Sequence, residues 1–346
     1  MNSFEAGVQS CRSRFDVNNR RYLGSKTKLL PSIEKSVLAA LGRVPETFFD
    51  IFAGSGVVGC HFANLGSRVV MNDILLHNSI AHETFLNHAH YSRESLATQL
   101  DQMDELKPLS GYITGTFGDR YFSRENAMMF DAWMEFANSA AHPAQLRSAL
   151  ITSIIYAADK VAQTVGHYDA FLRSSKRTKP AQLQLPETIG KGTGHLILTM
   201  DANIAVNHFE AEVMYIDPPY NSRQYSDTYH VLENLARWEK PPVFGVSRKM
   251  DRTCLKSPYS GRFAEEVFEE LVLNAKADLI VLSYSNTGKS RIARSNNVLS
   301  DQHILKVLKS RGRVDVKVLP YKEFSVGKTS IRQHTERVFV CRVGQR

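Results

Sequence analysis

The sequence predicts an α/β protein with a doubly wound sheet and an inserted region that is mainly helical. Two observations carry this prediction. A short apolar run over residues 46–51 leads into Gly54-Ser55-Gly56, and a predicted helix over 57–65 connects it to a second strand over 68–71. This spacing is typical of a βαβ unit. From residue 75 to about residue 196, long helical stretches replace the strands.

The remaining elements are predicted from apolar runs and from the residues that bound them. The expected helices are 127–140, 145–164, 227–238, 264–275 and 301–309. The expected strands are 196–200, 212–216, 278–283, 314–319 and 336–343. A turn that contains glycine separates the last two strands, which favours an antiparallel hairpin at the edge of the sheet. Residues 1–20 have neither helical nor strand periodicity, and we expect a loose lead-in there.

The composition excludes several classes of protein. With 346 residues, 43% of them hydrophobic, the chain can bury a large core and is neither a disordered tail nor a disulfide-stabilised miniature. Its four cysteines are spaced too widely for a zinc site or a disulfide framework, so we expect free thiols and no metal. No apolar run approaches the roughly 18 to 20 residues of a membrane span, and no signal peptide is evident, so we expect a cytoplasmic protein.

The net charge of +8 is distributed unevenly along the chain. Residues 1–239 carry 22 Lys and Arg against 25 Asp and Glu, whereas residues 240–346 carry 21 against 10. The last third of the chain therefore has an excess of +11, which favours a polyanionic partner.

Acidic residues follow four predicted strands, at the edge where open α/β sheets bind their ligands. They are Asp50, Asp73, Asp201 and Asp217. The Gly-x-Gly turn after the first strand lets the backbone approach a ligand closely, and Asp73 is placed to accept the hydroxyl protons of a ribose. Because the third glycine of a dinucleotide fingerprint is absent, we expect a nucleoside ligand without phosphates.

The tetrapeptide Asp217-Pro218-Pro219-Tyr220 directly follows a predicted strand and is the most specific signal in the chain. Its prolines make the turn rigid and remove two backbone donors. The exocyclic amine of a heteroaromatic base is a weak nucleophile, because its lone pair is delocalised into the ring. Asp217 and the Pro218 carbonyl could accept the amine hydrogens and localise that lone pair, while Tyr220 stacks on the base. A simple turn that closes a strand is the alternative, which the upstream glycine turn and Asp73 disfavour.

Five segments occur in a characteristic order: RYLGSK (residues 21–26), DIFAGSG (50–56), Asn72-Asp73, Asp201 and DPPYNSRQYSDTYH (217–230). In this the sequence resembles the adenine-specific N6 DNA methyltransferases, with an order similar to that of Dam-type enzymes. The resemblance implies a Rossmann-like sheet that uses S-adenosylmethionine as methyl donor. It also implies a catalytic methyltransferase domain of residues 21–74 and 196–346, with an inserted target-recognition region of residues 75–195.

The resemblance assigns a role to each matching residue. The cofactor would be bound by Tyr22, Lys26, Asp50, Phe52, Gly54, Gly56, Asp73 and Asp201. The catalytic turn would be Asp217, Pro218, Pro219 and Tyr220. Residues 282–285 look like the motif of the neighbouring strand, and Phe324 matches a second aromatic residue against the base.

Double-stranded DNA is the substrate that the resemblance implies, and its target adenine must leave the base stack to reach the catalytic turn. Basic and polar side chains would hold the duplex and read its sequence. The principal candidates are Arg173, Lys176, Arg177, Arg223, Gln224, Tyr225, Lys289 and Arg291, with Lys179, Arg248, Lys249 and Arg294 as further basic residues. Any one of these alone is more simply a solvated surface residue. A cognate restriction endonuclease that acts separately is a further partner.

Two alternatives stay open. The same fold could methylate cytosine N4, an RNA adenine or a glutamine amide, although Asp217 at the head of the turn favours adenine. A non-catalytic DNA-binding protein could also retain a methyltransferase shell, which the intact motifs disfavour. Cytosine carbon-5 chemistry needs a thiolate, and none of the cysteines stands in a position that resembles a nucleophile.

Overall fold

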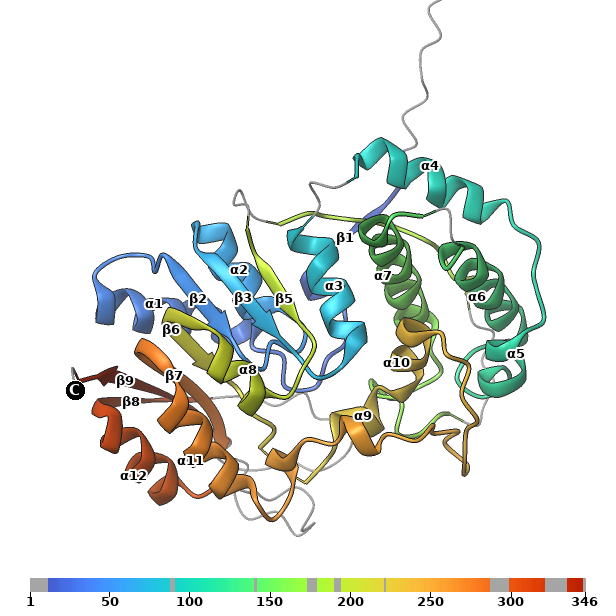
Figure 1. Cartoon of the computed structure of the whole chain (residues 1–346). Helices are drawn as coiled ribbons and strands as arrows, with labels where there is room; N and C mark the ends of the chain where they lie inside the picture. Colours follow the sequence, from blue (N-terminus) through green and yellow to red (C-terminus); the bar gives the residue numbers. More distant parts are fainter. Residues whose placement is uncertain are drawn as a thin grey trace, which may run out of the picture.

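The computed structural model describes residues 12–87, 91–139, 142–172, 179–189, 194–220, 222–286, 299–320 and 335–344. A sheet flanked by helices lies beside a second, helical layer (Figure 1). In spatial order the seven strands are β5 (Leu196–Leu198), β3 (Arg68–Asn72), β2 (Thr47–Asp50), β6 (Glu210–Ile216), β7 (Lys276–Asn286), β9 (Thr335–Val343) and β8 (Gly312–Pro320). The first five are parallel, and β9 is antiparallel to both of its neighbours. The predicted α/β fold is confirmed.

Both faces of the sheet are buried, which explains the nearly continuous apolar runs of its strands. Consecutive residues of β2 point to opposite faces, so Phe48 packs into one core cluster and Phe49 into the other. One face is covered by α1 (Leu30–Leu41) and α2 (Val57–Leu65). The other face is covered by α8 (Ala202–His208), α11 (Ala264–Asn274) and α12 (Asp301–Arg311).

The helical layer is drawn largely from the region between β3 and β5 (Figure 1). Its helices are α3 (Leu76–Leu86), α4 (Arg93–Asp104), α5 (Tyr112–Phe117), α6 (Arg124–Ala137) and α7 (Ala144–Val161). From later in the chain, α9 (Tyr225–Thr228) leads into α10 (His230–Arg237), and α10 packs against α3 and α7. The segment that follows β6 is therefore held between the sheet and this layer.

Several boundaries differ from those predicted. The helix expected over 127–140 begins at Arg124, because Ser123 Oγ accepts a hydrogen bond from the Asn126 amide at 3.3 Å and caps it. The helix expected over 227–238 is broken at Tyr229, where φ is −125°. The strand expected over 196–200 ends at Leu198. No helix was predicted at α1 or α8, whereas α3, α4 and α5 fall in the region that was expected to be helical without individual bounds. The hairpin prediction is confirmed, since β8 pairs antiparallel to β9 at the sheet edge.

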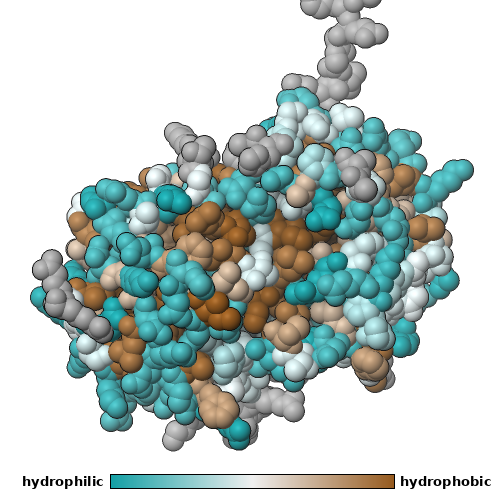
Figure 2. Space-filling model, in the orientation of Figure 1, coloured by the Kyte–Doolittle hydropathy of each residue, from teal (hydrophilic) through white to brown (hydrophobic). Residues whose placement is uncertain are grey.

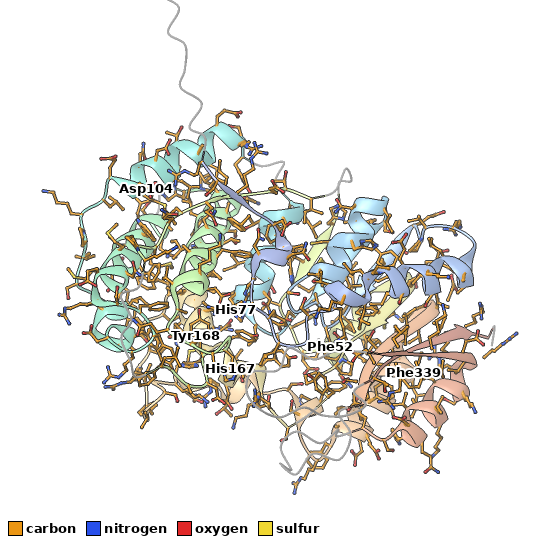
Figure 3. The ribbon with its side chains drawn as sticks, turned by 180° about the vertical axis from the view of Figure 1, so that it is seen from behind. Phe52, His77, Asp104, His167, Tyr168 and Phe339 are labelled. Atoms are coloured by element: carbon orange, nitrogen blue, oxygen red, sulfur yellow. The ribbon has the colours of Figure 1, made fainter. Side chains whose placement is uncertain are left out.

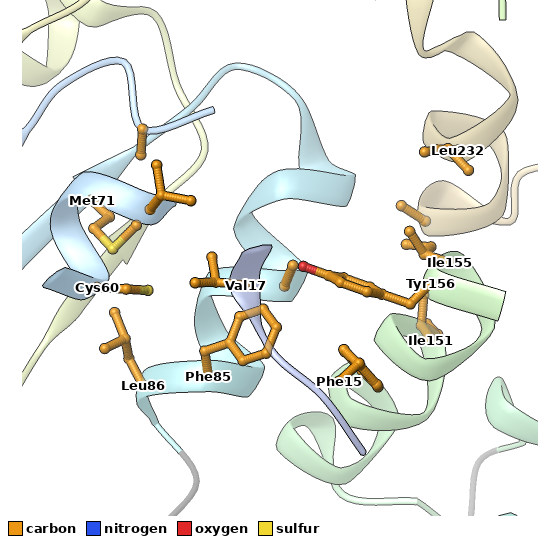
Figure 4. Packing of buried hydrophobic residues seen from close by; sticks show 14 of the residues in the cluster. Phe15, Val17, Cys60, Met71, Phe85, Leu86, Ile151, Ile155, Tyr156 and Leu232 are labelled. Atoms are coloured by element: carbon orange, nitrogen blue, oxygen red, sulfur yellow. The ribbon is translucent and has the colours of Figure 1, made fainter. Parts of the chain in front are cut away.

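The expectation of a loose lead-in is wrong for residues 12–20. Strand β1 (Arg14–Phe15) pairs with β4 (Leu185–Pro186), and the Phe15 ring stacks on Tyr156 with centroids 4.2 Å apart. Figure 4 shows Phe15 and Val17 packed among residues of α2, α3, α7 and α10. A two-residue strand followed by the short 3-10 helix η1 (Val17–Asn19) is too brief to produce a periodic signal.

Within the described ranges, no helix is long and apolar enough to cross a membrane. The same residues contain no group of three or more His, Cys, Asp and Glu side chains that could hold a metal ion. Of the described cysteines, Cys60 and Cys341 are buried and Cys254 is exposed.

Candidate active site

A pocket with about 910 Å³ of empty space, including its open mouth, lies at the carboxyl ends of β2, β3 and β6. Figure 2 shows apolar residues gathered near the centre of one face of the molecule, where the sheet meets the helical layer. Seen from behind in Figure 3, Phe52, one of the lining residues, lies between the strands and that layer.

The glycine turn is shaped by the side chains around it. Gly54 has φ of +53°, and a Cβ atom there would lie 2.9 Å from the Tyr22 ring. Its amide donates to Asp73 Oδ2 at 2.9 Å, and its carbonyl accepts from His82 Nε2 at 3.0 Å. Burial lowers the pKa of His82 to about 3, so the ring is neutral. Gly56, with φ of +86°, is the N-cap residue directly before α2. A side chain at Gly54 would therefore displace Tyr22 or the turn.

Two buried carboxylates stand behind the glycine turn. Asp50 Oδ2 accepts from the Gly59 amide at 3.1 Å, but Oδ1 has no hydrogen-bond partner among the described residues. Burial raises the pKa of Asp50, and the nearby Asp217 raises it further. Asp73 Oδ1 accepts from the Leu75 amide at 2.8 Å, and burial raises the pKa of Asp73 to about 6. The unpartnered oxygen of Asp50 is an acceptor suited to a cationic ligand group.

Lys26 lies between two carboxylates. Its Nζ is 2.9 Å from Asp217 Oδ1 and 3.4 Å from Glu336 Oε1, and it donates to the Gly24 carbonyl at 3.0 Å. Burial alone would lower the pKa of Lys26, but Asp217 and Glu336 raise it above its ordinary value. Burial raises the pKa of Asp217 to about 6, although Lys26 opposes that increase. One buried cation thus holds the first residue of the turn 217–220 by one oxygen.

A cluster of three tyrosines fixes the N-terminal segment that carries this lysine. The Tyr22 ring stacks on Tyr229 at 4.9 Å and 4°, and on Tyr225 at 5.6 Å and 29°. Tyr229 Oη accepts from the Leu23 amide at 2.7 Å, and Tyr225 Oη donates to the Leu23 carbonyl at 3.0 Å. These contacts attach residues 22–26 to the helices that follow the turn 217–220.

The turn 217–220 is supported by the neighbouring strand. Register places Ile216 of β6 beside Leu282 of β7, so the predicted motif 282–285 does lie next to the turn. Tyr284 Oη donates to the Tyr220 carbonyl at 3.3 Å. Tyr215 Oη donates to Ser283 Oγ at 2.9 Å beneath it. The end of β7 therefore fixes the backbone of the turn.

All the residues predicted for the catalytic turn and for the cofactor line this one pocket, with the exception of Gly56. Sequence reasoning missed Tyr259 of the 3-10 helix η5 (Pro258–Ser260), whose ring meets Phe52 edge to face at 4.9 Å. It also missed Glu336. Neither residue has a local signal, because η5 has no periodic pattern and Glu336 occupies an ordinary strand.

The residues predicted to contact DNA differ in how far their side chains are already engaged by other parts of the protein. Both amide atoms of Gln224 bond to the Ser257 backbone, at 3.0 and 2.8 Å, and Tyr225 belongs to the tyrosine cluster. Arg223 is exposed beside them, whereas Lys249 is paired with two carboxylates. Of the further basic residues, Lys179 is exposed and Arg248 is half-buried. The remaining predicted contacts lie outside the described residues, as does one predicted aromatic residue: Arg173, Lys176, Arg177, Lys289, Arg291, Arg294 and Phe324.

Comparison with known proteins identifies the family. Residues 22–289 match the family described as D12 class N6 adenine-specific DNA methyltransferase. The chain is 30% identical to the type II methyltransferase M.NlaIII of Neisseria lactamica, over 90% of this chain and 95% of that protein. It is 31% identical to modification methylase StsI of Streptococcus sanguinis, over 88% of this chain and 48% of that protein. It is also 24% identical to type II methyltransferase M.CviAII of Paramecium bursaria Chlorella virus 1, over 92% and 97% respectively. The chain therefore belongs to the D12 class of N6 adenine-specific DNA methyltransferases.

Proposed function

We propose that this DNA methyltransferase transfers a methyl group from S-adenosylmethionine to N6 of an adenine that has been flipped out of duplex DNA, at one specific sequence. The observation that carries the proposal is the shared pocket. Asp217, Pro218 and Tyr220 line the same space as the glycine turn and the acids of the strand ends. The residues proposed to bind the base and those proposed to bind the cofactor therefore surround one space.

The residues present fit S-adenosylmethionine. The orphaned Oδ1 of Asp50 is suited to the α-ammonium group. The edge-to-face pair of Phe52 and Tyr259 offers an aromatic wall for the adenine ring, with Asp201 nearby in the lining. Asp73, already fixed by two backbone amides, retains lone pairs for the ribose hydroxyls. When bound, S-adenosylmethionine supplies an electrophilic methyl group.

Asp217 is the group that prepares the amine. Lys26 holds Oδ1 at 2.9 Å, which leaves Oδ2 to accept a hydrogen of the N6 amine. The carbonyl of Pro218 accepts the second hydrogen, and together they localise the lone pair on nitrogen. The amine proton released on methylation leaves to water or through Asp217, whose pKa of about 6 suits such a relay. No covalent enzyme intermediate is required.

The proposed DNA contacts are inferred from the charge of the C-terminal third and from the position of the inserted region in the fold. The excess of +11 in residues 240–346 can hold a phosphate backbone, and Arg223 is exposed immediately beyond the catalytic turn. We assign target recognition to the region 75–195, whose helices α3 and α7 pack against α10. M.NlaIII is named a type II methyltransferase and StsI a modification methylase, so the proposal includes a cognate restriction endonuclease that acts separately. It also includes a cytoplasmic location, where the host DNA lies.

Transfer of tritium from methyl-labelled S-adenosylmethionine tests the proposed reaction. The purified chain is incubated with unmethylated genomic DNA, and the DNA is digested to nucleosides for chromatography. We expect label only in N6-methyldeoxyadenosine, with single-stranded RNA and protein as unlabelled controls. Label in N4-methylcytosine, in RNA or in no nucleoside at all would contradict the proposal.

A further inference from the structure

The two most exposed of the large apolar side chains described in the structure belong to one short turn. Val246 is 74% exposed and Phe244 is 65% exposed. Both belong to a turn of residues 244–249, which we call the apolar turn. Its two end residues, Phe244 and Lys249, exchange backbone hydrogen bonds at 2.8 and 3.0 Å. Gly245 and Arg248 take positive φ values of 68° and 50°, and these close the turn. Contact of these two side chains with another molecule would remove their apolar surface from water.

Hydrogen bonds and an ion pair at Ser247 and Lys249 fix the base of the apolar turn. The Ser247 carbonyl accepts from His230 Nε2 at 2.7 Å and from Tyr121 Oη at 3.0 Å. Ser247 Oγ donates to the Asp169 carbonyl at 2.9 Å. Lys249 Nζ lies 2.6 Å from Asp169 Oδ1. Because buried side chains of α10 and the helical layer fix its base, the turn presents its apolar tip at little cost in conformational entropy.

The base of the apolar turn is part of the wall of the active site. Val243 and Met250, which flank the turn, pack in one small apolar cluster with Leu75, Leu255 and Tyr225. The last three residues also line the pocket. The apolar tip is therefore anchored directly to the elements that would surround a flipped adenine.

We propose that the apolar turn enters the DNA and that Phe244 and Val246 occupy the place in the base stack that the target adenine leaves. This inference rests on the proposed function. Flipping a base costs a few kcal/mol of stacking and pairing, and apolar side chains that insert between base steps can offset that cost. Charge complementarity supports DNA as the partner, because the acids beside the turn, Asp169 and Asp227, pair with Lys249 and Arg252, and no ion pair of the described residues includes Arg248 in the same turn.

The test compares two DNA substrates that differ only in the cost of flipping. Both carry the methylated sequence, determined beforehand by mapping modified bases; in one the target adenine is paired with thymine, in the other it faces an abasic nucleotide. For the double variant F244A/V246A we expect kcat/KM to fall about tenfold on the paired duplex, because the inserted side chains no longer offset part of the flipping cost; a tenfold loss corresponds to about 1.4 kcal/mol. On the abasic duplex, where the adenine is already unpaired, we expect a loss of less than about threefold.

The matched control is V318A, because Val318 is 62% exposed but lies on the edge strand β8. This variant should match the wild type on both duplexes. Equal losses of the double variant on the two duplexes, or no loss on the paired one, would overturn the role of the apolar turn while leaving the methyltransferase assignment intact. A wild-type chain that methylates neither duplex would overturn the proposed function itself.

Discussion

Replacing Lys26 with methionine should move the acid limb of the pH–rate profile upward. In the proposed mechanism Asp217 must be ionised to accept a hydrogen from the target amine, so activity should fall as pH drops through the pKa of Asp217, which is about 6. Lys26 opposes the effect of burial and holds that pKa down. Methionine has a similar length and no charge, so the variant removes the cation with little change in packing.

The size of the shift follows from the geometry. At an effective dielectric constant of about 20, unit charges 2.9 Å apart attract by about 6 kcal/mol, whereas one pKa unit corresponds to about 1.4 kcal/mol. Residual solvent around Asp217 and the charge spread over two oxygens reduce the effect, and cations this close typically shift a carboxyl pKa by about 1 to 3 units. The acid limb of K26M is therefore expected at about pH 7 to 9.

The assay is kcat/KM for DNA at saturating S-adenosylmethionine between about pH 5 and 9.5, since this ratio reports groups of the enzyme before DNA binds. The variant E336Q provides a control of opposite sign. Glu336 raises the pKa of Asp217, so its neutralisation should move the acid limb below that of the wild type. An acid limb of K26M that stays where the wild type has it, or an upward shift in E336Q, would refute the reasoning.

Three further predictions concern the cofactor site and the DNA. D50N should raise the melting temperature of the ligand-free chain by about 2 °C, because burial raises the pKa of Asp50 and its buried charge therefore costs stability at pH values above the ordinary pKa of an Asp. In the same thermal assay, the stabilisation by S-adenosylmethionine should shrink. A lower melting temperature of the ligand-free variant would contradict this prediction. G54A should weaken S-adenosylmethionine binding in calorimetry, because its Cβ would lie 2.9 Å from the Tyr22 ring, and unchanged affinity would show that the turn does not approach the cofactor. Affinity for DNA in fluorescence anisotropy should fall steeply between low and moderate salt, and a flat response would remove the phosphate contacts from the account.

The part of the site that sequence could predict lies at the ends of parallel strands. Asp50, Asp73 and Asp217 each follow an apolar run, and parallel strands bring their carboxyl ends to one edge. The periodic runs therefore predicted which residues meet, although helix boundaries moved by a few residues where a cap such as Ser123 decided them.

The remaining parts depend on contacts between distant segments that have no local pattern. Glu336 reaches Lys26 only because the last strand returns beside β7, and Tyr259 reaches Phe52 through a single 3-10 turn. Gln224 is predicted to contact DNA, and in the structure without DNA its amide bonds to the Ser257 backbone. In each case polarity and spacing were visible in the sequence, but the partner was not.

The central claim is that Asp217 at the head of the catalytic turn activates adenine N6 in duplex DNA. Long-read mapping of modified bases in a host that expresses the wild-type chain, compared with one that expresses D217A, tests it most directly. The account predicts N6-methyladenine at one recurring sequence with the wild type and none with D217A. Modified cytosine, no recurring sequence, or equal adenine methylation with D217A would contradict it.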